Sequence, residues 1–267
     1  DDRDRVAAPL GTVAERVATA GLDADADAAA IAAMLDATDT LADAAEAGQV
    51  WSDLATREKL AAHGFYDVFD HRKDFPPEWN AVKVFEKGGR ADKLLVALDE
   101  LGSEFMEENT LAALKRLGPE VAVEEMHARA QKREKAAVEI LGTIGSEEPV
   151  ETLIEYVDAD SDRPLQKVTF RALGEIGAAE AVQPIANKLV ADHETTRSRA
   201  ARALGMIGDT RAIQPLAERL EVDESDRVRA SAAWALNAIG TERALSIVRT
   251  YRDDRAYLVQ AEAERAG

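Results

Sequence analysis

Few side chains of this chain could hold a metal ion or transfer a proton. The sequence has four histidines and no cysteine, which excludes disulfides, thiolate zinc sites and cysteine nucleophiles. One group falls at helical spacing and could offer imidazole and carboxylate ligands to a transition metal. It comprises His63, Asp67, Asp70, His71 and Asp74. Gly64 and the pair Pro76-Pro77 interrupt a continuous helix there, so we interpret the group as a solvated polar face.

No motif of a nucleotide-binding loop or a nucleophilic hydrolase occurs. The chain lacks the glycine-rich dinucleotide fingerprint, the Walker loop and the Gly-x-Ser-x-Gly elbow. Carboxylates are so numerous, with 51 Asp and Glu residues, that no pair stands out as general acid and base. We therefore expect no catalytic residue, no cofactor and no metal site, and we predict a protein that binds another macromolecule.

The elements that would position a binding surface come from a segment that recurs along the second half of the chain. Four copies align at residues 133–145, 165–177, 196–208 and 228–240, and their closing glycines are 32, 31 and 32 residues apart. Apolar residues follow five and eight positions after each glycine, which is the spacing of one helical stripe. Glycine suits the left-handed residue just past a helix end. Each copy therefore predicts a helix, a tight turn and a second helix.

Weaker copies of this segment end at Gly118 and Gly89. With them we expect about six helix pairs between Pro77 and Arg252, followed by a capping helix from Asp254 to Ala266. Alanine, the best helix former, supplies 52 of the 267 residues, and alternating strand patterns are absent. One helix pair cannot bury its apolar face, so the pairs should stack into a continuous core.

At these residues the chain resembles the HEAT-like repeats of the phycobilisome lyase type. Their pattern is close to Val-Arg-x-x-Ala-Ala-x-Ala-Leu-Gly-x-Ile-Gly, then Ala-Val-x-Pro-Leu. Residues 228–240 match nearly every position, with Asn237 in place of one glycine, and residues 181–185 and 212–216 match the second part. The resemblance is weak over residues 77–131 and absent before them. It implies an all-α, right-handed α-α superhelix that serves as an interaction scaffold.

One dipeptide has a second resemblance. His193-Glu194 is similar to one His-Glu motif of the HEAT-fold deoxyhypusine hydroxylases. Those enzymes need several such motifs in symmetric repeats to hold two irons, and this chain has one. We therefore do not expect that activity.

The second helix of each pair should line the concave face of the solenoid, where such proteins bind their partners. Helical spacing places polar residues of mixed charge on this face, which suits a protein surface better than an apolar ligand. The predicted partner-binding residues are Glu151, Glu155, Tyr156, Gln183, Asn187, Lys188, Gln214, Glu218, Arg219, Ser246, Thr250 and Tyr251. Nothing in the sequence identifies the partner.

Arg197 and Arg229 occupy equivalent positions in two successive repeats. We expect them to pair with loop acids such as Asp192, Asp223 or Asp226, and to hold the repeats together rather than to bind a ligand.

The segment before the repeats is acidic and then aromatic. Residues 1–50 carry 11 acids and 3 bases and predict two amphipathic helices, packed on the first repeat or loosely attached. Residues 51–76 form an aromatic-rich junction that caps the solenoid or binds a partner. Its possible aromatic patch comprises Phe65, Tyr66, Phe69, Phe75 and Trp79. The remaining regions are the repeats at 77–252 and the C-terminal capping helix at 253–267.

The charge balance limits the partners. The net charge is −18, and a chain rich in Asp and Ala but poor in Lys is typical of halophiles, and we expect a haloarchaeal origin. Salt at molar concentration screens the self-repulsion of such a surface. Phosphate contacts need a basic stripe, so we expect no nucleic-acid partner. There is no apolar run long enough for a membrane span, and no recognisable signal peptide, so we expect a cytoplasmic protein.

Two other functions stay open. The family resemblance alone suggests a chromophore-lyase-like enzyme or chaperone, which would need an apolar pocket of the size of a bilin. A signalling adaptor in archaeal taxis or motility would use the N-terminal region for one partner and the repeats for another.

Overall fold

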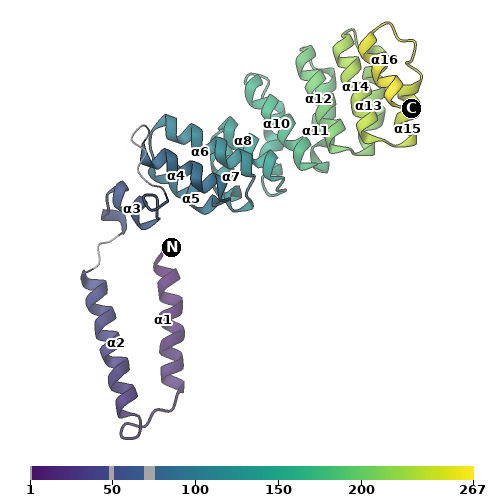
Figure 1. Cartoon of the computed structure of the whole chain (residues 1–267). Helices are drawn as coiled ribbons and strands as arrows, with labels where there is room; N and C mark the ends of the chain where they lie inside the picture. Colours follow the sequence, from purple (N-terminus) through teal and green to yellow (C-terminus); the bar gives the residue numbers. More distant parts are fainter. Residues whose placement is uncertain (1, 48–50, 69–75) are drawn as a thin grey trace. The chain divides into compact units, whose positions relative to one another are not determined.

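The computed structural model describes residues 2–47, 51–68 and 76–267, and these residues are helical, with no β-strand among them. The chain divides into two compact units, Asp1–Ala55 and Thr56–Gly267. Figure 1 shows the helices of both units.

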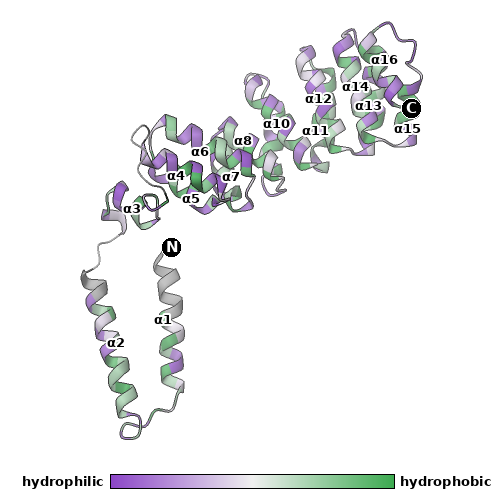
Figure 2. Cartoon of the chain, in the orientation of Figure 1, coloured by the Kyte–Doolittle hydropathy of each residue, from purple (hydrophilic) through white to green (hydrophobic). Residues whose placement is uncertain are grey.

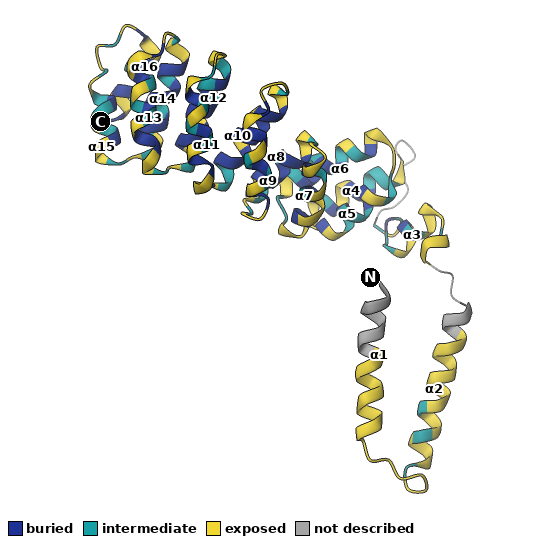
Figure 3. Cartoon of the chain, turned by 180° about the vertical axis from the view of Figure 1, so that it is seen from behind, coloured by how far each residue is buried: buried dark blue, intermediate teal, exposed yellow. Residues whose placement is uncertain are grey.

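The first unit contains the two helices predicted from residues 1–50. They are α1 (Asp2–Thr19) and α2 (Ala28–Ala47), and a 3₁₀ helix (Trp51–Asp53) follows them. Asp23 closes the turn between the two helices, because its carboxylate accepts the backbone N–H groups of Asp25 at 3.0 Å and Ala26 at 2.8 Å. None of residues 10–43 is buried, and Figure 3 shows α2 almost wholly exposed. The exposed large apolar residues of this unit include Leu10, Val13, Val17, Leu22, Leu35 and Leu41.

The second unit is a solenoid of helix pairs. After α3 (Thr56–Ala62), residues 76–267 form six successive pairs and one further helix, α16 (Tyr257–Arg265). The pairs are α4 (Pro77–Lys87) with α5 (Ala91–Glu100), α6 (Glu104–Leu117) with α7 (Val123–Gln131), α8 (Lys135–Ile144) with α9 (Val150–Glu155), α10 (Arg163–Ile176) with α11 (Val182–Asn187), α12 (Glu194–Ile207) with α13 (Ile213–Val222), and α14 (Asp226–Ile239) with α15 (Glu242–Arg249). The prediction of an all-α solenoid is confirmed (Figure 1).

The repeated glycines end the first helices as their spacing predicts. Gly145, Gly177, Gly208 and Gly240 have φ angles between 68° and 79°, the left-handed conformation that a side chain disfavours. The N–H of Gly208, for example, donates to the carbonyl of Leu204 at 3.1 Å. The turn that follows this glycine ends in a 3₁₀ helix (Thr210–Ala212) that leads into α13.

Successive first helices pack directly on one another, so that α12 contacts both α10 and α14. Small side chains permit this approach: Ala200, Ala201, Ala232 and Ala233 are fully buried. Gly205 is needed for the same reason, since a Cβ there would lie 2.6 Å from Cα of Ala235. Figure 2 shows the hydrophobic residues of these helices, and Figure 3 shows that the buried residues gather where neighbouring helices meet.

One apolar stripe of each second helix faces the same core. Leu153, Ile185, Leu216 and Val248 are the equivalent residues of α9, α11, α13 and α15, and all are fully buried. The other side of these helices is left for solvent or a partner. In α9 and α11 the helix tightens at its end into 3₁₀ helices, Tyr156–Asp158 and Lys188–Val190.

Candidate functional site

A polar ladder fixes how each second helix returns to the next first helix. Arg197 donates to both carboxylate oxygens of Asp223, at 2.8 and 2.9 Å, and to the carbonyls of Ala191 and Asp192, each at 2.9 Å. The Asp223 side chain is only 2% exposed. The predicted pairing with Asp223 is thus confirmed, and Asp192 contributes its backbone carbonyl.

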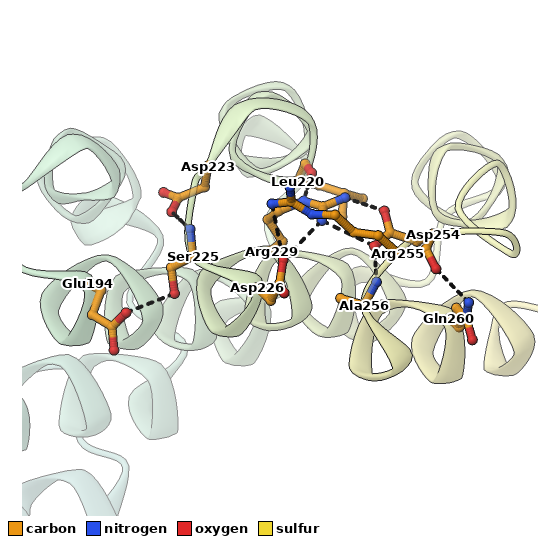
Figure 4. Close-up of polar contacts among 10 residues, drawn as sticks. All are labelled: Glu194, Leu220, Asp223, Ser225, Asp226, Arg229, Asp254, Arg255, Ala256 and Gln260. Atoms are coloured by element: carbon orange, nitrogen blue, oxygen red, sulfur yellow. Dashed lines mark hydrogen bonds and ion pairs between the residues drawn. The ribbon is translucent and has the colours of Figure 1, made fainter.

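The equivalent Arg229 makes a similar network one repeat later (Figure 4). Its guanidinium donates to the carbonyl of Leu220 at 2.9 Å, to Asp226 at 3.4 Å and to both carboxylate oxygens of Asp254. Asp254 is therefore the main partner of Arg229, whereas the predicted acids were Asp192, Asp223 and Asp226, of which only Asp226 contacts this arginine. Asp254 follows Asp223 by 31 residues, one repeat interval, so the two carboxylates occupy equivalent positions.

Burial of the Asp223 and Asp254 carboxyl groups opposes their ionisation, but the facing guanidinium groups outweigh this effect. The pKa of each carboxyl group lies below its ordinary value of 3.8. A backbone N–H also lowers each pKa, from Ser225 to Asp223 at 2.9 Å and from Ala256 to Asp254 at 2.8 Å. Both acids are therefore ionised in the folded protein near neutral pH.

The ladder holds the second helices so that their polar side faces outward. Most of the residues predicted for partner binding lie on this exposed side, which we term the second-helix face. The exposed ones are Glu151, Glu155, Gln183, Asn187, Gln214, Glu218, Ser246 and Thr250, and the half-buried ones are Lys188, Arg219 and Tyr251. Two pairs of side chains are hydrogen-bonded within these helices. Gln183 donates to Asn187 at 2.9 Å, and Gln214 donates to Glu218 at 3.4 Å.

A groove of about 350 Å³ lies between α11 and α13 on this face. Four predicted residues line it together: Gln183, Asn187, Glu218 and Arg219. Val190, whose side chain belongs to the same groove, is 67% exposed. The groove therefore combines amide, acidic, basic and apolar groups in one hollow.

Two predicted residues lie further inward than their spacing indicated. Tyr156 is buried, with 6% exposure, and its hydroxyl donates to the carbonyl of Ala130 at 3.0 Å. Its placement on the partner face is wrong, because this position of each second helix turns toward the neighbouring helices: the equivalent Lys188, Arg219 and Tyr251 are half-buried as well. Lys188, at the equivalent position, is 13% exposed and binds Asp158 and Asp160, each at 2.8 Å.

The aromatic patch predicted for the junction is divided by the structure. Phe65 is fully buried against Phe85, in edge contact with the ring centroids 4.9 Å apart, so it cannot contact a partner. Burial and a hydrogen bond to Glu78 raise the pKa of Tyr66 to about 12. The half-buried Trp79 lies beneath the ammonium group of Lys83, at 3.7 Å. Phe69 and Phe75 lie outside the described residues.

The histidine group considered as a metal site is only partly described. Asp70, His71 and Asp74 lie outside the described residues, and the part of the chain that is described contains no cluster of three or more potential ligands. His193 is exposed and contacts Arg163 of the preceding repeat. Nor does any described helix combine the length and the apolar character that crossing a bilayer requires.

A second exposed surface was not predicted from the sequence. It is formed by the first helices α8, α10, α12 and α14 together with α16. One hollow of about 440 Å³ is lined by basic residues, including Lys167, Arg171, Arg199 and Arg202. The signal was available in the aligned repeats. The seventh position of each copy is Glu139, Arg171, Arg202 or Trp234, in helices that are otherwise rich in alanine.

Comparison with solved structures gives similar helical proteins at low identity. The complex of CpcE and CpcF of phycocyanin lyase from Nostoc sp. PCC7120 is 19% identical, with a TM-score of 0.43, and the match covers 82% of this chain and 96% of that one. Human deoxyhypusine hydroxylase in complex with glycerol is 19% identical, with a TM-score of 0.35, and the match covers 79% and 95%. An engineered protein is 20% identical, with a TM-score of 0.40, over 80% and 90%. No curated protein sequence matches the chain.

The family comparison concerns the repeats themselves. Residues 150–237 and 183–266 each match the family described as HEAT repeats. These two stretches include the pairs from α9 to α15, the polar ladder and the groove between α11 and α13. The matching residues, 150–266, are thus similar to HEAT repeats.

Proposed function

We propose that this chain is a non-catalytic scaffold whose second-helix face binds a protein partner. One observation carries the proposal: Gln183, Asn187, Glu218 and Arg219, from two successive repeats, meet in a single groove. Four residues that the repeat spacing predicts for partner binding thus line one hollow.

The chemistry of this groove favours a protein partner. Amide groups can both donate and accept hydrogen bonds, and Glu218 and Arg219 offer both signs of charge. Exposed Val190 and the half-buried Pro215 add apolar contact at the same place. Specific protein interfaces combine such an apolar contact with a polar rim. Because neighbouring second helices repeat the arrangement, a partner can extend along the face beyond one groove.

The test is capture of partners by the tagged protein from a lysate of its own organism, kept at molar potassium chloride. An Asp-rich chain with a net charge of −18 supports a halophilic origin, for which this salt is the working condition. The test variant carries Gln214→Lys and Glu218→Lys. Both positions are exposed and lysine is a good helix former, so the fold should persist, as circular dichroism will verify.

The matched control carries Thr143→Lys and Glu147→Lys, which makes the same charge change at exposed positions in α8 and in the turn after it, outside the second helices. We expect the wild type and the control to retain the same polypeptide in stoichiometric amount, and the test variant to lose it. Equal retention by all three proteins contradicts the proposed face. If the wild type retains no polypeptide, the scaffold proposal itself is wrong.

A further inference from the structure

The outer side of the first helices carries a continuous trough. A hollow of about 440 Å³ is lined by residues of α8, α10 and α12, and a second of about 380 Å³ by residues of α12, α14 and α16. Arg202 lines both hollows and so joins them. We term this surface the first-helix trough.

The trough is built from the repeat itself. Arg171, Arg202 and Trp234 occupy the same position in three successive repeats, and their helices pack side by side. Packed helix axes are about 10 Å apart, so these side chains recur along the trough at about that interval. The guanidinium of Arg202 lies over the indole ring of Trp234, 4.4 Å from its centroid. Such cation–π contact holds the arginine in place.

The residues that line the trough carry a net positive charge, whereas the chain as a whole is negative. Five basic residues and three acidic ones line it, whereas the chain has 33 basic and 51 acidic residues. The three acids already have cationic partners: Glu139 binds Lys115, Glu175 binds Arg171 and Glu262 binds Arg265. Within the described part of the chain, Lys167, Arg199, Arg202 and Arg227 have no carboxylate at ion-pair distance. These four cations are available to an anionic ligand.

Apolar groups lie among these cations. Met206 is 40% exposed in the first hollow, and Leu258 is 58% exposed in the second, beside Trp234. Phosphates would meet unfavourable neighbours, because Glu139 and Glu175 line the same hollow as Arg199. A ligand with separated carboxylates and apolar side chains fits better than a uniformly charged backbone.

We propose that the first-helix trough binds an acidic, partly apolar segment of a partner protein, independently of the second-helix face. The four available cations come from three successive helices, α10, α12 and α14, whose spacing of about 10 Å matches carboxylates about three residues apart in an extended segment. The four first helices of the trough and α16 together span about 40 Å, which an extended segment of about 12 residues covers. Met206, Trp234 and Leu258 receive its apolar side chains.

Met206 provides a local readout of binding. The chain has four methionines, of which Met106 and Met126 are buried and Met34 belongs to the first unit. The full chain, labelled with ¹³C in the methionine methyl groups, is titrated with a fluorescent peptide of repeated Glu-Ser-Leu units. The same peptide measures affinity by fluorescence anisotropy. Peptides of repeated Glu-Ser-Ser and Lys-Ser-Leu units, and an oligothymidylate, serve as comparison ligands at the same salt.

We expect the Glu-Ser-Leu peptide to shift the Met206 methyl signal and to leave that of Met126 unchanged. Arg199→Glu with Arg202→Glu should weaken its binding by about tenfold or more. Arg243→Glu with Arg252→Glu, at exposed sites outside the trough, should leave binding unchanged. The Glu-Ser-Ser peptide should bind less tightly, and the Lys-Ser-Leu peptide should not bind. Thermal unfolding of each variant, compared with that of the wild type, verifies that both variants fold.

Three results would overturn the proposal. If no peptide shifts the Met206 methyl signal, the trough is not a binding surface. Tighter binding of the oligothymidylate, lost in the Arg199→Glu, Arg202→Glu variant, would assign the trough to nucleic acid. Dimerisation of the wild type in sedimentation experiments, abolished by the same variant, would assign it to a second copy of the chain. The second-helix variants do not alter any trough residue, so the two proposals fail separately.

Discussion

Arg197 donates hydrogen bonds to both carboxylate oxygens of Asp223, at 2.8 and 2.9 Å, and so connects the start of α12 to the end of α13. Gln166 occupies the equivalent position in the preceding repeat and makes a similar connection with other groups. Its side-chain amide donates to the carbonyl of Val157 at 2.8 Å and to Asp160 at 2.9 Å. A polar side chain at this position therefore ties the start of a first helix to backbone carbonyls at the end of the preceding pair.

Removing Asp223 should destabilise the repeats. Asp223→Ala leaves the guanidinium of Arg197, whose side chain is 16% exposed, without its carboxylate. Breaking a buried pair on one side costs about 3 kcal/mol, because the remaining charge is desolvated and unpaired. Denaturant unfolding measures this loss. Asp92→Ala, which breaks the exposed pair of Arg90 and Asp92, should change the free energy of unfolding much less.

The same carboxylates make stability depend on pH. The pKa values of Asp223 and Asp254 are lower in the folded protein than their ordinary value of 3.8. Their contribution is therefore complete above that ordinary value, and it is lost as the pH falls through the folded-state pKa values. Acid should destabilise the wild type more steeply than Asp254→Asn, since the variant lacks one of these titrations. Unfolding curves measured from neutral pH down to about pH 3 test this difference; parallel pH profiles would contradict it.

The sequence predicted the solenoid because its repeat is encoded by residues with strong local constraints. Gly208 and Gly240 end their helices in the left-handed conformation, and Ala200 and Ala232 occupy the tight contacts between helices. These features depend on neighbours in the chain or on a fixed repeat distance. The six pairs and most of the exposed second-helix residues followed from them.

The features that sequence reasoning missed depend on distant or averaged properties. Tyr156 lies inward because its hydroxyl donates to the carbonyl of Ala130, which is distant in the sequence. The trough was not predicted because the net charge of −18 is a sum over the whole chain, whereas Arg199 and Arg202 line the same hollow.

Two glycines in equivalent helices should respond differently to alanine. In Gly205→Ala the new Cβ would lie 2.6 Å from Cα and 2.8 Å from Cβ of Ala235, so backbone must move. We expect a loss of about 1–3 kcal/mol despite the better helix propensity of alanine. In Gly174→Ala the nearest atoms belong to the side chain of Met206, from 3.0 Å. The nearest of them is Cβ, which must move by a few tenths of an ångström, but the sulfur and the methyl group can rotate away, so the loss should be smaller. Equal losses in denaturant unfolding would contradict this packing argument.

Asn237 replaces the repeat glycine at the point where the solenoid ends. Its side-chain amide donates to the carbonyl of Glu262 at 2.8 Å and to the Glu262 carboxylate at 3.1 Å, which fastens α16 to α14. Asn237→Ala should weaken this attachment by about 1 kcal/mol. Hydrogen exchange of the amides in Tyr257–Arg265 should then be faster, while that of α10 stays unchanged. Unaltered exchange in α16 would show that apolar packing alone holds this helix.

The most direct test of the scaffold account is site-specific photo-crosslinking in a lysate of the source organism at molar potassium chloride. A photoreactive benzoylphenylalanine replaces, one at a time, the exposed residues Gln183 and Gln214 of the second-helix face, or the exposed Glu147 as a control. The account predicts that one polypeptide crosslinks from both second-helix positions and not from position 147. Crosslinks from position 147 alone, or equally from all three positions, would contradict it.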